Sequence, residues 1–153
     1  MLEAPRIVHT PPQRVACLPL VVSRADIRRV MGPGLDEVRA AIAAQGHRSA
    51  GPWLTHHLRM DPDVFDFEIC VPVDADIVPV GRVRPGMLRA ATVARTVHHG
   101  DYEGLVDAWG KLMTWIEAQA LMPADDLWER YTIGPETSDD PADWRTELNR
   151  PLT

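Results

Sequence analysis

Apolar residues recur along the chain with two different spacings, which predict strands and helices in a repeated order. Between residues 65 and 73 apolar and polar residues alternate, the period of a strand with two unlike faces. Residues 74–86, rich in proline, glycine and valine, are predicted to be a connector. Short apolar runs bounded by turn residues predict further strands at 14–22, 53–60, 89–98, 127–133 and 144–152.

Two helices are predicted between these strands. The first is expected to begin near Gly32-Pro33-Gly34 and to end at Gly46, because proline suits a first helical turn and glycine a C-terminal cap. The second is expected to follow Asp101, whose side chain can cap a helix. Its apolar residues fall at helical spacing on one face: Tyr102, Leu105, Val106, Trp109, Leu112, Met113 and Ile116.

The order strand-helix-strand-strand occurs twice, and a sequence match accompanies it. Residues 68–73 (EICVPV) resemble residues 147–152 (ELNRPL). We interpret this as an internal duplication, with repeats over about 12–73 and about 87–153. The predicted fold class is therefore α+β, with duplicated βαββ repeats forming one curved antiparallel sheet and two main helices on one face.

Composition narrows the range of functions. The 153 residues are 45% apolar and 25% charged, which is ordinary for a single globular domain. A net charge of −6 argues against nucleic-acid binding. The early apolar stretch at 15–22 is too short to span a membrane, and no cleavage site of small residues follows it. The two cysteines, Cys17 and Cys70, are expected to be free thiols of a cytoplasmic protein.

The strand predicted at 127–133 carries a carboxylate in an apolar row. Leu127, Glu129, Tyr131 and Ile133 share one face of this strand. If that face lines a closed pocket, the charge on Glu129 is costly unless a partner neutralises it. A cationic ligand would do so, and aromatic faces would add attraction. On an open sheet face the same carboxylate would simply meet water, and the pattern leaves both interpretations open.

The remaining candidate residues are weaker. Tyr102 and Trp109 share one helical face, where they either pack on the sheet or form the wall of a pocket. The histidine pairs at 56–57 and 98–99 each offer at most one side chain to a single site, because strand neighbours point to opposite faces. Without CxxC or HExxH spacing, we expect no metal site and no cofactor. Cys17 is expected to be a buried, unreactive thiol.

An ordered set of short motifs runs over about residues 5–153. In the second half they are the run 98–105 (HHGDYEGL), Ala108-Trp109, Trp115-Ile116, Glu129-Arg130-Tyr131, Thr146-Glu147 and Pro151-Leu152, and in the first half Gly51-Pro52 and residues 68–73. Together they resemble the GyrI-like small-molecule-binding domain, a family related to the effector domains of multidrug-sensing transcription regulators. Some members stand alone, without a DNA-binding domain, and the resemblance leads us to expect this stand-alone form here.

The resemblance implies a hydrophobic pocket at the pseudo-twofold axis between the repeats, for bulky and often cationic aromatic compounds. It implies that Glu129 is the buried carboxylate and Tyr131 its partner. His57 stands where many members have a tyrosine, which puts the cation preference in doubt. The expected ligand contacts are Glu129, Tyr131, His57, Trp53, Tyr102 and Trp109.

Three functions stay open. The first is a stand-alone binding protein for small hydrophobic or cationic ligands, acting in sensing or sequestration. The second is a cofactor-independent hydrolase that opens cyclopropane-type electrophiles with Glu129 and Tyr131, as the resemblance implies for certain members. The third is a protein-interaction module whose acidic surface meets a basic partner. Neither nucleic acid nor membrane is an expected partner, and the physiological ligand is left open.

Overall fold

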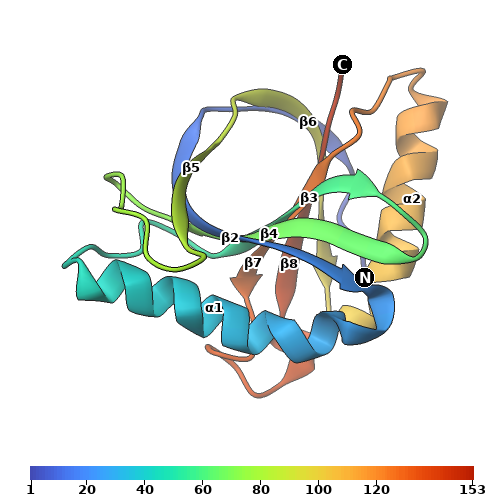
Figure 1. Ribbon diagram of the computed structural model, residues 1–153. Helices are drawn as coiled ribbons and strands as arrows, with labels where there is room; N and C mark the ends of the chain where they lie inside the picture. The colour runs from blue at the N-terminus through green and yellow to red at the C-terminus, as the bar shows by residue number, and fades with distance from the viewer. The chain divides into compact units, whose positions relative to one another are not determined.

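The computed structural model describes residues 1–153, apart from the side chain of residue 60. It divides the chain into two compact units, one of residues 11–90 and one of residues 1–10 with 91–153. Each unit combines antiparallel strands with one long helix, so the α+β class is confirmed (Figure 1). No helix among the described residues is both long and apolar enough to cross a membrane.

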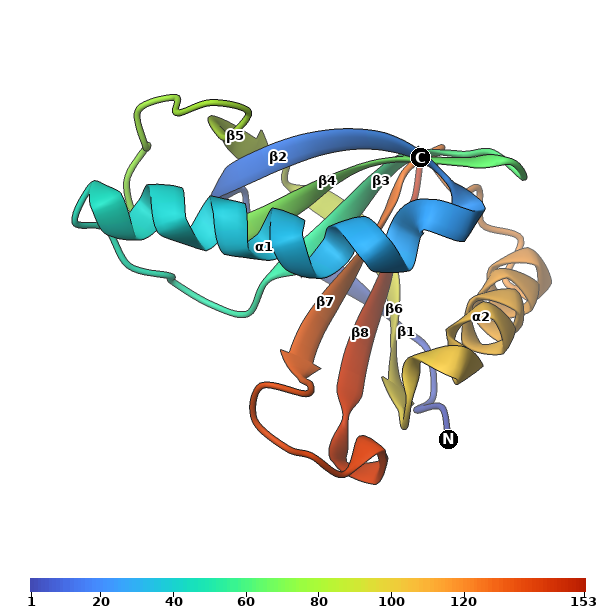
Figure 2. The ribbon, with the colours of Figure 1, turned by 60° about the horizontal axis from the view of Figure 1, so that its bottom comes forward.

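The unit of residues 11–90 has four strands in the order β3-β4-β2-β5, with helix α1 along β2 and β4 (Figure 2). Inward-facing residues of β2 and β4, such as Leu18 and Ile69, form its core with Val38 and Ile42 of the helix. The elements are β2 (Gln13–Ser23), a 3-10 turn (Arg24–Asp26), α1 (Ile27–Ala44), β3 (Leu54–Met60), β4 (Val64–Pro72) and β5 (Arg84–Leu88).

The other unit has the strand order β7-β8-β6-β1, with helix α2 along β6. Its core joins Leu112 and Ile116 of the helix to Ala94 and Leu148 of the strands. The elements are β1 (Arg6–Thr10), β6 (Ala91–His99), a 3-10 turn (Tyr102–Gly104), α2 (Leu105–Ala118), β7 (Leu127–Ile133), a second 3-10 turn (Pro141–Asp143) and β8 (Arg145–Pro151).

Both units follow one plan, which confirms the duplicated βαββ fold. In each, the strand after the helix pairs with the next strand, which pairs in turn with the strand before the helix. The registers also agree, since Thr55 lies opposite Ile69 in one unit and Glu129 lies opposite Leu148 in the other. Thr55 is therefore the structural equivalent of Glu129.

Helix α1 begins earlier than the sequence predicted. It starts at Ile27 rather than near Gly32-Pro33-Gly34, and Pro33 lies within it. A proline inside a helix removes one backbone hydrogen bond and costs about 3 kcal/mol. The first turns form nevertheless, because Ile27, Val30 and Met31 pack against the hydrophobic core. Tertiary packing thus overrides the local preference of proline for a helix start.

Two edge strands were not predicted. Residues 84–88 form β5, which begins inside the connector predicted at 74–86, and residues 6–10 form β1. β5 contains Pro85 and Gly86, a composition that is tolerated at a sheet edge. Both edge strands are specified by pairing with β2 and β6 rather than by a hydrophobic pattern of their own. The predicted apolar stripe of the second helix is also wrong at Val106, which is 79% exposed.

The segment before α2 is shaped by one glycine conformation and two hydrogen bonds. Gly100 adopts a φ of 122°, a conformation that favours glycine. The Nε2 of His98 donates a hydrogen bond to the carbonyl oxygen of Asp101 at 2.8 Å. The Asp101 carboxylate then accepts from the backbone N–H of Glu103 at 3.0 Å, so Asp101 caps the 3-10 turn that leads into α2, whereas the N-cap of α2 itself is Gly104. These contacts fix the position of Tyr102, the first residue of the 3-10 turn that leads into α2.

Asp101→Ala should remove the capping acceptor and lower the free energy of unfolding by about 1 kcal/mol. Asp101→Asn is the matched control, because asparagine keeps a side-chain oxygen while losing the charge. Urea denaturation followed by circular dichroism measures both variants. Equal destabilisation by the two substitutions would contradict a capping role.

Candidate functional site

The carboxylate of Glu129 is held by two aromatic side chains. The indole Nε1 of Trp109 donates a hydrogen bond to its Oε1 at 2.7 Å, and the hydroxyl of Tyr131 donates to its Oε2 at 2.8 Å. Both hydrogen bonds are partly buried. Short hydrogen bonds from two rigid donors fix the orientation of the carboxylate.

The packing of α2 explains why Trp109 reaches Glu129. Ala108, Leu112 and Ile116 of the helix are buried together with Leu148 of β8. Glu129 lies opposite Leu148 on the neighbouring strand, and directly opposed residues of an antiparallel pair point to the same face. The carboxylate is therefore on the side of the sheet that the helix covers, where the indole can reach it.

Further aromatic rings lie beside Tyr131. The ring of Tyr102 meets that of Tyr131 edge-on, with 5.8 Å between centroids, and lies 5.0 Å from that of Trp144. Tyr131 is only 8% exposed. A Cβ atom at Gly134 would come within 3.0 Å of the Tyr102 hydroxyl, so a glycine there permits the close approach. We call Glu129, Tyr102, Trp109, Tyr131 and Trp144 the Glu129 cluster.

The negative charge of Glu129 affects the ionisation of Tyr102 within this cluster. The pKa of Tyr102 is raised, first by burial of its phenol and then by the negative charges of Glu129 and Glu136. Both causes disfavour a second negative charge at this place. The cluster thus combines a carboxylate with aromatic rings, and the faces of such rings can attract a cation.

Four of the six residues predicted as ligand contacts lie in this cluster: Glu129, Tyr131, Tyr102 and Trp109. Sequence analysis missed Trp144. Its signal is the alternation of faces that continues from β8, because Trp144 lies in extended backbone just before this strand and precedes by two positions Thr146, which lies opposite Tyr131. That signal becomes readable only when the register of β7 and β8 is known.

The other two predicted contacts, Trp53 and His57, belong to the unit of residues 11–90. Trp53 is partly buried against the hydrophobic core of that unit. His57 is 7% exposed, stacks on Phe67 at 5.2 Å between ring centroids, and has its Nε2 3.2 Å from Thr55 Oγ1. Their role in ligand binding stays a prediction, as does the pocket at the pseudo-twofold axis.

The two repeats differ at the position of the carboxylate. Thr55 and His57 occupy the places in β3 that Glu129 and Tyr131 occupy in β7. The Glu129 cluster is therefore a property of the second repeat. Among the described side chains, one group could together hold a metal ion: Cys17, Glu68 and Cys70, in the first repeat.

Comparison with known proteins gives the same family as the sequence motifs. The model of the GyrI-like small molecule binding domain matches residues 3–152. A comparison with curated proteins finds no match.

Solved structures agree in fold. In a cryo-EM structure of an EcmrR–DNA complex, EcmrR matches with a TM-score of 0.86 and 22% identity, over 99% of this chain and 57% of that one. This chain thus spans little more than half the length of that protein. The crystal structure of the EcmrR C-terminal domain matches with a TM-score of 0.87 and 22% identity, covering 98% and 97% of the two chains. The structure of SAV2435 bound to tetraphenylphosphonium matches with a TM-score of 0.70 and 11% identity, covering 99% and 94%.

At these identities the structural matches show a shared fold, whereas the family model covers nearly the whole chain. The protein therefore belongs to the GyrI-like small-molecule-binding domain family.

Proposed function

We propose that the protein binds bulky, hydrophobic, cationic aromatic molecules at the Glu129 cluster, and that it acts in sensing or sequestration. The observation that carries this proposal is the carboxylate of Glu129, whose two oxygens accept hydrogen bonds from Trp109 and Tyr131. A cytoplasmic location is part of the proposal, because the free thiols Cys17 and Cys70 persist in a reducing compartment.

A fixed carboxylate among aromatic rings favours a cation for electrostatic reasons. Its two hydrogen bonds orient it before any ligand arrives, so little reorganisation opposes binding. At an effective dielectric constant of about 20, a unit cation about 6 Å away gains roughly 3 kcal/mol. The faces of Tyr102 and Trp144 can add a cation–π contribution of about 0.5–2 kcal/mol. The hydrophobic part of a ligand would supply the remaining affinity.

The structural neighbours support the choice of probe. SAV2435 shares the fold of this chain, and its structure holds tetraphenylphosphonium. That ion is a delocalised cation with four phenyl rings, and it has no hydrogen-bonding groups. Its binding to this chain would have to depend on charge and apolar contact, the two properties that the Glu129 cluster offers.

Glu129→Gln should weaken the binding of tetraphenylphosphonium by about 100-fold, the equivalent of roughly 3 kcal/mol. Glutamine has the same shape, and its amide can accept from Trp109 and donate to the Tyr131 oxygen. The substitution therefore removes the charge while keeping the local packing. Isothermal titration calorimetry of the wild-type protein and the variant gives the two dissociation constants.

Glu117→Gln is the matched control, because Glu117 is exposed on the same helix as Trp109 and the charge change is identical. A neutral probe, triphenylphosphine oxide, should bind the wild-type protein and Glu129→Gln equally well. Loss of affinity for both probes to the same degree would show that Glu129 acts through packing and not through charge.

A hydrolase is the second candidate, and the hydrogen bond from Tyr131 to Glu129 favours it. In this reaction Glu129 takes a proton from a water molecule whose oxygen attacks a ring carbon of a strained cyclopropane. The ring C–C bond breaks and the other carbon takes up a proton, so the product contains one added water. Tyr131 would orient the water or the substrate. The two hydrogen bonds already made by the carboxylate suit a fixed counter-charge better than a base, so binding remains the leading proposal.

A product assay separates the two candidates, and Tyr131→Phe tests the part that the Tyr131 hydroxyl would take in hydrolysis. If the protein is a hydrolase, this variant should lower the rate of product formation by about 100-fold or more, within the range of acid–base contributions. For a binding protein, mass spectrometry of the wild-type protein incubated with a cyclopropane-bearing electrophile should show no water adduct above the uncatalysed background. An adduct formed equally fast by wild type and Glu129→Gln would exclude catalysis at this site.

A further inference from the structure

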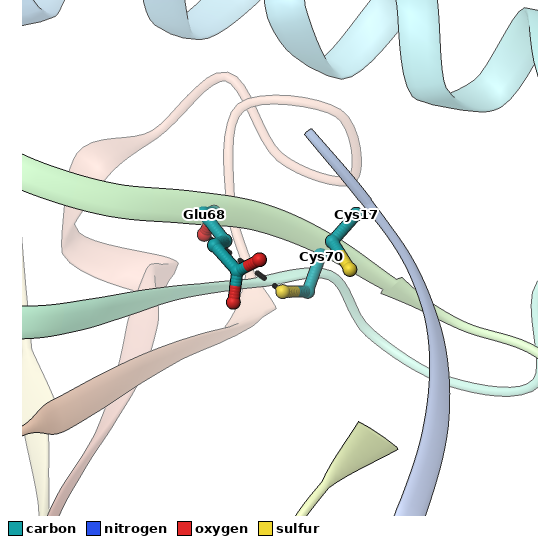
Figure 3. A group of neighbouring side chains, drawn as sticks. All are labelled: Cys17, Glu68 and Cys70. Atoms are coloured by element: carbon teal, nitrogen blue, oxygen red, sulfur yellow. Dashed lines mark hydrogen bonds between the residues drawn. The ribbon is translucent and has the colours of Figure 1, made fainter. Parts of the chain in front are cut away.

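Strands β2 and β4 bring the two cysteines of the chain together. Cys17 lies directly opposite Cys70 in the antiparallel register, and each is 2% exposed. Neither of the two is in a disulfide. Glu68 precedes Cys70 by two positions in β4, so its side chain projects from the same face. Figure 3 shows the two sulfur atoms and the Glu68 carboxylate gathered beside β4, and these ligand atoms all lie within 4.8 Å of one another.

The carboxylate of Glu68 is oriented by two neighbouring basic side chains. His56 Nδ1 lies 3.7 Å from one of its oxygens, and Arg84 Nη2 lies 3.4 Å from the other. The Glu68 carboxylate therefore lies beside the two thiols in a defined orientation.

The fold leaves room and access for an ion. A Cβ atom at Gly86 in β5 would lie 2.5 Å from the Cys17 sulfur, so the glycine provides the space that the sulfur occupies. A cavity of about 270 Å³ opens here, and its lining includes Cys17, His56, Glu68 and Arg84. A small hydrated ion could therefore reach the sulfur of Cys17 and the carboxylate of Glu68.

We propose that Cys17, Cys70 and Glu68 bind a thiophilic divalent cation of the Zn²⁺ class, with a fourth position open to water from the cavity. Zinc binds thiolate at about 2.3 Å and carboxylate oxygen at about 2.0–2.2 Å, in tetrahedral geometry. Because the three ligand atoms already lie within 4.8 Å of one another, only small side-chain rotations are needed to reach this coordination geometry. Two thiolates and one carboxylate exceed the charge of the ion by one, and Arg84 offsets that excess. His56 would support the ligand carboxylate from outside.

The second repeat shows that the fold does not require two thiols here. Its equivalent of the Cys17–Cys70 pair is Arg95 opposite Asn149, and the equivalent of Glu68 is Glu147. The Glu147 carboxylate is neutralised by Arg95 at 3.4 Å and by Arg130 at 3.5 Å. In the first repeat two sulfur ligands stand in place of Arg95 and Asn149. Glu147 therefore provides a matched control for Glu68.

The test uses the reduced, tag-free full chain with Co²⁺ as a spectroscopic probe for a zinc site. We expect one equivalent of Co²⁺ to give an intense thiolate-to-cobalt charge-transfer band and the visible bands of tetrahedral cobalt. One equivalent of Zn²⁺ should remove both. Cys17→Ala and Cys70→Ala should each lose most of the charge-transfer intensity and weaken Zn²⁺ binding at least tenfold in competition with a chromogenic chelator. Glu68→Gln should weaken binding less, and Glu147→Gln should leave it unchanged.

A second measurement needs no variant and so does not depend on how the substitutions fold. Zn²⁺ should slow alkylation of both cysteines of the wild-type protein by iodoacetamide, followed by mass spectrometry, whereas Mg²⁺ should have no effect. The inference is overturned if Co²⁺ gives no thiolate band, if Zn²⁺ gives no protection, or if the reduced thiols form a disulfide in preference to binding the ion. None of these outcomes bears on the Glu129 cluster, whose ligand is tested separately.

Discussion

The two hydrogen bonds to the Glu129 carboxylate connect the binding chemistry to the packing of a helix. Trp109 can donate only while α2 is docked on its sheet, and that docking depends on Leu112 and Ile116 meeting Leu148. Tyr131 comes from the same strand as Glu129, so its donor is always near. The carboxylate is thus oriented by one local and one tertiary contact, and a ligand that binds it also stabilises the docked helix.

Duplication gives the chain two copies of one framework with different chemistry. On the helix-covered side, Glu129 of the second repeat corresponds to Thr55 of the first. On the opposite side, Cys70 of the first repeat corresponds to Asn149 of the second, and Cys17 to Arg95. Substitutions at a few equivalent positions therefore account for a carboxylate among aromatic rings in one repeat and a thiol pair in the other. The strand order and the registers are the same in both.

Local patterns predicted much of the fold because its central strands and helices carry strong periodicity. The alternation at 65–73 marked β4, and the i, i+2 spacing of Glu129 and Tyr131 placed both on one face. Features that depend on pairing between distant segments were missed, among them the edge strands at 6–10 and 84–88. The opposition of Cys17 and Cys70 belongs to the same class, because register and not spacing brings the two thiols together.

The central claim is that Glu129 acts as the counter-charge for a cationic ligand. The most direct measurement follows the indole N–H resonance of Trp109 by ¹H–¹⁵N NMR while tetraphenylphosphonium is added, with Trp109→Phe used for the assignment. The account predicts that this resonance shifts along the binding curve in the wild-type protein, and that it scarcely moves at the same concentrations in Glu129→Gln. Saturable binding that leaves the Trp109 resonance unchanged would contradict it.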